Sequence, residues 1–276
     1  MKKKYERRSF LKKAAVGGAV AAASTTLAAP AIAASKVDIA IVATWGRDFP
    51  GLGTGAQRFA DRLTEMSDGR FNVEYFAAGE RVGAFDSFDE VASGNAQIYH
   101  AADYYWKGKH PGWAYFTSVP FGLTYTECNA WIRFGGGQAL WDELADDYGL
   151  KNFLCGNTGV QMGGWFNKEI NSASDLKGLK MRIPGIAGEI WNKAGGTSVM
   201  LPGGEIFQAL EKGTIDATEW LGPANDLAFG LPQIAKYYYM PGWHEPGSML
   251  EFSINKKAFE ALPSHYQFIL KIACQS

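Results

Sequence analysis

Residues 175–184 read DLKGLKMRIP, and this run points to the fold class. Its apolar residues alternate with Lys180 and Arg182, a period of two that predicts a short strand, which Pro184 ends. Arg182 then lies at the carboxyl end of the strand, where the ligands of α/β proteins collect. Its guanidinium either grips a carboxylate through two parallel hydrogen bonds or stays at the surface beside an acid.

Residues 211–220, which read EKGTIDATEW, predict a second strand end of the same kind. A helix stops at Gly213 and a strand follows, so Glu219 and Trp220 fall at its end. Glu219 either has a structural partner or belongs to a site. An anionic ligand in the same pocket would repel Glu219, and a cation between them would remove the repulsion. Hard cations bind carboxylate, amide and carbonyl oxygens, which the Gln161 side chain and the Trp220 main chain could supply.

Short apolar runs alternate with helical patterns along the rest of the chain. This order predicts an α/β protein with largely parallel sheets and with no internal repeat or flexible linker. Strands are expected over 37–44, 71–76, 96–102, 152–155, 161–166, 180–183, 215–220 and 249–255. Helices are expected over 52–67, 85–93, 126–134, 138–148, 187–194 and 205–212.

Composition limits the classes of function. The 276 residues are 47% hydrophobic and 20% charged, with a formal net charge of −1. This balance provides no electrostatic basis for binding nucleic acid, and we expect no such partner. The three cysteines do not suggest a disulfide framework, and the four histidines lack the spacing of a metal motif. The nucleophile elbow and the phosphate loop of common hydrolases and kinases are also missing from the sequence.

The N-terminus resembles a targeting segment. Paired arginines at Arg7 and Arg8 precede an apolar run over 14–28 and a small-x-small cleavage pattern at 31–33. We therefore expect residues 1–33 to be a twin-arginine-type signal peptide and the mature protein to be periplasmic. The alternative is an amphipathic first helix or a retained anchor, but the run is shorter than the ~20 residues that a spanning helix needs.

Residues 51–56 match the letters of the dinucleotide fingerprint, and Glu74 lies where that fingerprint places its acidic residue. The first glycine of that motif must follow its strand at once, whereas residues 45–50 intervene here. A loop leading into a helix is the favoured interpretation. An exported nucleotide-dependent oxidoreductase that uses Gly51 to Ala56 is kept as the rival.

Three other segments carry either packing or binding residues. Residues 156–166 form a glycine-rich crossing, where the backbone can approach another segment or a ligand closely. Residues 104–106 and 237–245 are aromatic clusters with polar tips. Each cluster is either part of a core or the wall of a pocket.

Together these segments resemble the extracytoplasmic solute receptors of tripartite ATP-independent periplasmic (TRAP) transporters. The run 175–184 is similar to the most recognisable stretch of that family. The runs 156–166, 205–223 and 237–245 look closest to the branch that binds 2-oxo acids such as pyruvate together with a metal cation. The resemblance extends from about Val37 to the end of the chain.

The resemblance implies a binding protein, not an enzyme, that captures a small 2-oxo or 2-hydroxy monocarboxylate for the membrane subunits of a TRAP transporter. It implies that Arg182 pairs with the carboxylate and that a sodium or calcium ion is held by Gln161, Glu219 and the Trp220 carbonyl. The substrate-binding positions that it implies are Arg182, Gln161, Trp220, Trp243, Glu245, Tyr104 and Tyr105. A receptor that binds another organic acid without metal is a second alternative.

The resemblance also implies a two-lobed, periplasmic-binding-protein-like α/β fold with a ligand cleft between the lobes. The first lobe is expected to comprise residues 34–157 and 246–276, and the second lobe residues 158–245. The chain stops within a helical pattern at its C-terminus. We therefore expect a C-terminally truncated fold with an incomplete first lobe, and a homodimer only in a full-length form.

Overall fold

The computed structural model describes residues 36–275. The expected signal peptide, residues 1–33, lies outside the described residues. Within 36–275, no helix combines the length and the apolar character that crossing a membrane requires.

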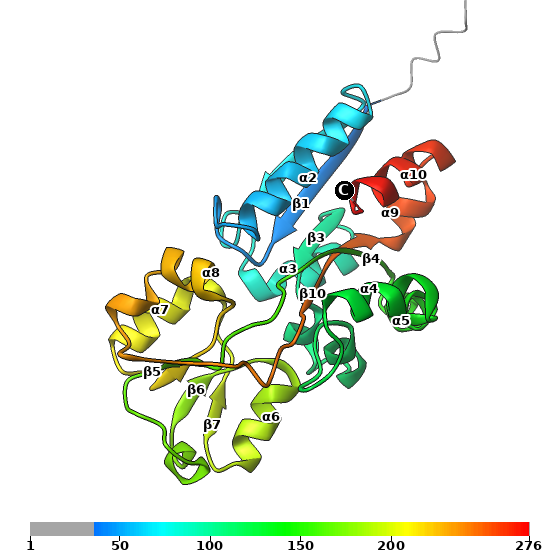
Figure 1. Ribbon diagram of the computed structural model, residues 1–276. Helices are drawn as coiled ribbons and strands as arrows, with labels where there is room; N and C mark the ends of the chain where they lie inside the picture. The colour runs from blue at the N-terminus through cyan, green and yellow to red at the C-terminus, as the bar shows by residue number, and fades with distance from the viewer. Residues whose placement is uncertain (1–35, 276) are drawn as a thin grey trace, which may run out of the picture. The chain divides into compact units, whose positions relative to one another are not determined.

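The described residues form two five-stranded sheets with helices beside them (Figure 1). The first sheet has the order β2-β1-β3-β10-β4, and the second has the order β7-β6-β8-β5-β9. The strands of the first sheet are β1 (Val37–Ala43), β2 (Phe71–Phe76), β3 (Ile98–Ala101), β4 (Leu150–Asn157) and β10 (Met249–Asn255). Those of the second are β5 (Gly164–Phe166), β6 (Lys180–Arg182), β7 (Thr197–Val199), β8 (Ala217–Thr218) and β9 (Tyr237–Tyr239).

Helices accompany each sheet. Those beside the first sheet are α2 (Gly53–Met66), α3 (Ser87–Ala92), α4 (Tyr125–Phe134), α5 (Gly137–Asp146), α9 (Lys256–Glu260) and α10 (Ser264–Ala273). Those beside the second are α6 (Gly185–Lys193), α7 (Gly203–Glu211) and α8 (Pro223–Ala228). Short 3₁₀ helices occur at Ala84–Asp86, Asp103–Trp106, Pro111–Phe116, Ala173–Leu176 and Leu231–Gln233.

Both sheets are mixed, so the expectation of largely parallel sheets is wrong. β1 pairs in parallel with β2 and β3, but β10 runs antiparallel to β3 and β4. In the second sheet, β6 is parallel to β7 and β8, while β5 is antiparallel to β8 and β9. A buried strand is apolar on both faces whichever way its neighbour runs, so the hydrophobic pattern does not report strand direction.

The chain passes between the sheets twice. Residues 158–163 join β4 to β5, and residues 240–248 join β9 to β10. The backbone of Gln161 donates to the Glu245 carbonyl at 3.1 Å, so the two crossing segments are hydrogen-bonded to each other. These crossings agree with two lobes, while the lobe boundaries at 157/158 and 245/246 stay a prediction.

Two expected strands that contain predicted site residues are at most half as long in the structure. The strand expected over 161–166 covers only β5, and that expected over 215–220 covers only β8. Gln161, Glu219 and Trp220 therefore lie outside the ladders. Their side chains are consequently placed beside the second sheet and not within its hydrogen-bonded strands.

Candidate functional site

Arg182 ends β6 and is buried, with 1% of its surface exposed. Its Nη1 forms an ion pair with Glu219 Oε1, its Nε donates to the Leu201 carbonyl at 3.1 Å, and its Nη2 reaches the Tyr105 hydroxyl at 3.4 Å. Burial opposes the charge, but Glu219 and two tyrosines raise the pKa of Arg182 above its ordinary value. The surface interpretation of this arginine is therefore wrong, and the guanidinium carries its charge into the interior.

Glu219 lies beside Arg182 because of the strand register. β6 and β8 pair in parallel with Arg182 opposite Thr218, and the Glu219 amide donates to the Arg182 carbonyl at 3.3 Å. The Glu219 side chain is fully buried. Its Oε2 makes no hydrogen bond and lies 3.5 Å from His244 Nε2. One carboxylate oxygen is thus paired and the other is available.

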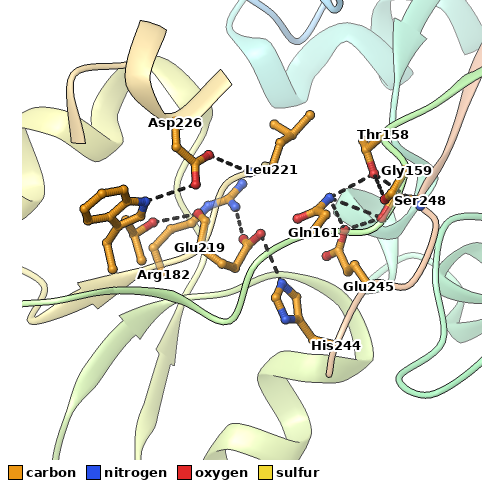
Figure 2. A network of polar contacts seen from close by, with 12 residues as sticks. Thr158, Gly159, Gln161, Arg182, Glu219, Leu221, Asp226, His244, Glu245 and Ser248 are labelled. Carbon is orange, nitrogen blue, oxygen red and sulfur yellow. Dashed lines mark hydrogen bonds and ion pairs between the residues drawn. The ribbon is translucent and has the colours of Figure 1, made fainter. Parts of the chain in front are cut away.

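Gln161 and Glu245 come from the two crossing segments and face each other (Figure 2). Gln161 Nε2 donates to Glu245 Oε2 at 2.7 Å, and the Ser248 hydroxyl donates to the same oxygen. Gln161 Oε1 and Glu245 Oε1 are buried without a hydrogen-bond partner. Burial and the Glu219 charge raise the pKa of Glu245 to about 7.

His244 completes a group of three possible metal ligands. Glu219, His244 and Glu245 each offer one ligand atom, and these atoms lie within 4.8 Å of one another. Burial lowers the pKa of His244, but contact with Glu219 outweighs it, and the pKa is raised. The sequence analysis missed this histidine because it searched for spacing along one segment. The sequence did place His244 directly before Glu245, a predicted site residue, and this neighbourhood could have indicated it as a candidate.

A narrow cavity lies against this group. It leaves about 10 Å³ of free volume, which is close to the space of one water molecule. Its lining includes Arg182, Gln161, Tyr104, Tyr105 and Trp220 among the predicted site residues. The Arg182 guanidinium also lies 5.4 Å from the centre of the Trp220 ring, within the range of a cation–π contact.

Trp243 is the predicted site residue that neither lines the cavity nor bonds to Arg182, Gln161 or Glu219. Its ring packs beside His244 and Phe121, and its carbonyl accepts a hydrogen bond from the Phe121 amide at 3.1 Å. Glu219 and Glu245 adjoin the cavity through their bonds to Arg182 and Gln161. The roles of all these residues in binding stay predictions.

The donor set fits a hard cation. Gln161 Oε1, Glu219 Oε2 and Glu245 Oε1 are buried acceptors without a hydrogen-bond donor. Buried polar atoms normally have partners, and a cation bound by carboxylate and amide oxygens is one way to satisfy them. Two ionised carboxylates and one guanidinium leave this group short of positive charge unless Glu245 or His244 is protonated or a cation is bound.

The glycine-rich run 51–56 has a structural explanation. β1 ends at Ala43 and α2 begins at Gly53, so a loop separates the strand from the helix. A Cβ atom at Gly53 would lie 2.2 Å from the Gly46 carbonyl oxygen. Close approach of two backbone segments therefore accounts for this glycine, and the strand-turn-helix geometry of a dinucleotide site is not formed.

The fold is that of a solute-binding protein. The sequence profile of the bacterial extracellular solute-binding proteins, family 7, matches residues 43–276, and the chain belongs to this family. The family comprises receptors that bind solutes and not enzymes.

Three relatives are especially informative. The chain is 48% identical over 224 residues to a monocarboxylate 2-oxoacid-binding periplasmic protein from Nostoc sp.. This match covers 80% of the chain and 62% of that relative, so the chain spans less than two thirds of its length. A TRAP periplasmic solute-binding protein from Pseudoalteromonas atlantica, solved with sodium and pyruvate, is 48% identical with a TM-score of 0.85. A counterpart from Colwellia psychrerythraea, solved with calcium and pyruvate, is 48% identical with a TM-score of 0.84. Each structural match covers 87% of this chain and 73% of the other.

Proposed function

We propose that this chain is a periplasmic receptor that captures a small 2-oxo monocarboxylate, or a 2-hydroxy analogue, together with a sodium or calcium ion for a TRAP transporter. The observation that carries the proposal is the burial of Arg182 and Glu219 in one group beside unpartnered oxygens of Gln161 and Glu245. The ligands named for the Pseudoalteromonas and Colwellia relatives match that chemistry.

Exchange of partners is the central step of the proposed mechanism. Without ligand, Arg182 and Glu219 neutralise each other. A ligand carboxylate would take the place of Glu219 on the guanidinium, through two parallel hydrogen bonds. Glu219, Gln161 and the Trp220 carbonyl would then hold the cation, with Glu245 and His244 close enough to contribute. The cation would supply the positive charge that Glu219 loses and would bind the carboxylate and keto oxygens of the ligand.

Ligand entry requires the lobes to separate, because the cavity has room for little more than a water molecule. Several contacts join the segments around the first sheet to helices of the second. Asn225 Nδ2 donates to the Pro50 carbonyl at 2.8 Å, and Lys107 Nζ donates to the Gly185 carbonyl at 3.0 Å and to Glu189 Oε1 at 2.7 Å. Ligand and cation stabilise this closed arrangement to the extent that they bind it more tightly than the open one.

Calorimetry on metal-stripped protein tests the proposal. Pyruvate, lactate and larger 2-oxo acids are titrated with and without sodium or calcium. We expect heat of binding only when carboxylate and cation are both present, and none in Arg182→Gln. Arg47→Gln, which breaks an exposed pair with Glu80, should bind as the wild type does. Binding of pyruvate to Arg182→Gln with unchanged affinity would refute the role of the arginine. Binding that is independent of cation would favour the metal-free receptor.

Two partners belong to the same proposal. The membrane subunits of a TRAP transporter would receive the closed receptor. A full-length form would be a homodimer, and the mixed-occupancy dimer described for a 39% identical relative from Bordetella bronchiseptica supports this. Size-exclusion chromatography with light scattering on the full-length protein checks the dimer.

A further inference from the structure

The peptide unit between Trp220 and Leu221 is held from one side. The Leu221 amide donates to Asp226 Oδ1 at 3.0 Å in a buried hydrogen bond (Figure 2). A trans peptide is planar, and its N–H and C=O groups point in opposite directions. The bond to Asp226 therefore turns the Trp220 carbonyl away from α8. Within residues 36–275 no hydrogen-bond donor reaches that carbonyl oxygen.

Asp226 is itself fixed by the second sheet. It is 1% exposed, and its Oδ2 accepts from Trp165 Nε1 at 3.0 Å and from the Tyr238 hydroxyl at 2.7 Å. Trp165 and Tyr238 are paired in register on β5 and β9, and their rings stack with centres 4.0 Å apart. Side chains from β5 and β9 therefore fix the Asp226 carboxylate, and this carboxylate in turn fixes the Trp220–Leu221 peptide.

All three partners of Asp226 are donors, which matches an ionised carboxylate. Burial raises the pKa of Asp226, and the hydrogen bonds from Leu221, Trp165 and Tyr238 counter the rise. A hydrogen bond from an N–H group to a charged acceptor is stronger than a neutral one. It also polarises the peptide, because hydrogen bonds in series strengthen one another, and this places more negative charge on the Trp220 oxygen.

We propose that Asp226 is a positioning residue for the cation, which orients and polarises the Trp220 carbonyl through the Leu221 amide without touching the cation. The inference rests on the proposed function, since it assumes a cation at that carbonyl. Groups that orient the ligands of a metal typically change metal affinity by 10- to 100-fold when they are mutated.

Cation affinity in two matched variants provides the first test. Asp226→Asn keeps the size of the side chain but removes its charge, and Tyr238→Phe removes one donor to Asp226 without touching the Leu221 bond. We expect Asp226→Asn to weaken calcium or sodium binding, measured with pyruvate present, by about 10- to 100-fold. Tyr238→Phe should stay close to the wild type. Pyruvate affinity at saturating cation should change far less than cation affinity in either variant.

The outcomes separate this inference from the proposed function. A wild type that shows no cation-dependent binding of pyruvate overturns the proposed function and the inference with it. If the wild type does bind pyruvate in a cation-dependent way, and a folded Asp226→Asn variant binds the cation with equal affinity, the inference alone is overturned. A merely structural role for Asp226 would lower the thermal midpoint without separating cation affinity from pyruvate affinity.

A measurement on the wild type covers the case in which Asp226→Asn does not fold. Trp220–Leu221 is the only Trp-Leu pair in the sequence. Protein labelled with ¹³C at tryptophan carbonyls and ¹⁵N at leucine therefore gives one correlated amide signal in an HNCO spectrum. We expect its carbonyl shift to move when cation and pyruvate are added, and its amide proton to lie downfield because of the charged acceptor. A carbonyl chemical shift that stays the same when the cation is added contradicts the inference.

Discussion

Charge burial distinguishes the Arg182–Glu219 pair from the other arginine pairs at the level of single residues. Its side chains are 1% and 0% exposed, whereas those of Arg47 and Glu80 are 44% and 38% exposed. A buried pair loses its hydration, and the loss is offset only while both partners remain. An exposed pair stays hydrated and contributes little. The same kind of contact therefore has different consequences at the two places.

Arg182→Gln should destabilise the protein by about 3–5 kcal/mol, because Glu219 is left buried without its partner. Arg47→Gln should cost less than about 1 kcal/mol. Urea unfolding of both variants, in buffer without ligand, measures the difference. If both variants lost the same free energy of unfolding, the prediction that Glu219 is left buried and unpaired in Arg182→Gln would be wrong.

Two buried acidic residues, Asp103 and Glu251, should make the free energy of unfolding depend on pH. Both side chains are fully buried. Burial, and after it the charge of Asp103, raises the pKa of Glu251 well above its ordinary value. Burial also raises the pKa of Asp103 to about 7. A carboxyl group with a raised pKa keeps its proton in the folded protein after the unfolded chain has lost it. Raising the pH above the unfolded values therefore favours unfolding.

Glu251→Gln should remove the share of this dependence that Glu251 contributes, because the amide stays neutral at every pH. The stability of the wild type should fall relative to Glu251→Gln between pH 5 and pH 7, by roughly 1 kcal/mol per pH unit for one proton. Chemical unfolding at several pH values measures the two curves. The exposed Glu211→Gln serves as control and should follow the wild type. If the free energy of unfolding changed with pH equally in the wild type and in Glu251→Gln, the raised pKa of Glu251 would be contradicted.

Helix α2 shows at the level of elements how two nearby glycines differ. Gly53 begins the helix, and a Cβ there would lie 2.2 Å from the Gly46 carbonyl oxygen. A Cβ at Gly55 would lie no closer than 4.0 Å to its nearest neighbour, the Arg58 side chain. Only the first glycine is required by the close approach of another segment.

Gly53→Ala should therefore destabilise the protein by about 1–3 kcal/mol, as forced overpacking does. Gly55→Ala should stabilise it by roughly 0.5–1 kcal/mol, since alanine restricts the unfolded chain and favours a helix. Thermal unfolding of the two variants decides the sign of each change. A stabilised Gly53→Ala would show that the loop before α2 can move aside.

At the scale of the whole molecule, the proposed partner exchange makes ligand and cation dependent on each other. Carboxylate alone would displace Glu219 from Arg182 and leave Glu219 unpaired. Cation alone would compete with the Arg182 charge beside Glu219. Arg182 and Glu219 are both compensated when the site is empty and when ligand and cation are both bound, but not when only one of the two is bound, so each should strengthen the binding of the other.

Pyruvate and cation together should raise the thermal midpoint by more than the sum of their separate effects. A ligand at 100 times its Kd adds about 2.7 kcal/mol, which corresponds to roughly 5–10 °C for a chain of this size. Differential scanning calorimetry of metal-stripped protein gives the four midpoints that are needed. Additive shifts would contradict the exchange.

Local pattern predicted much of the fold. The strands 71–76 and 249–255 agree with β2 and β10 to the residue, and Arg182 does lie at the end of β6. The three-residue strands β7 and β9 were not predicted, because neither stretch shows the alternation of apolar and polar residues that marked β6. The family was recognised from the order and spacing of its motifs, and the sequence profile confirms it.

The sequence by itself determined that Arg182 ends a strand shortly before Pro184, since alternation and a following proline are local properties. Strand direction and the partners of each site residue were decided by tertiary structure alone. Arg182 meets Glu219 through the register of β6 and β8, while Glu219 meets His244 where a crossing segment returns to the first sheet. Those contacts join residues far apart in the chain, and their free energy depends on burial, which appears only when the two sheets have packed.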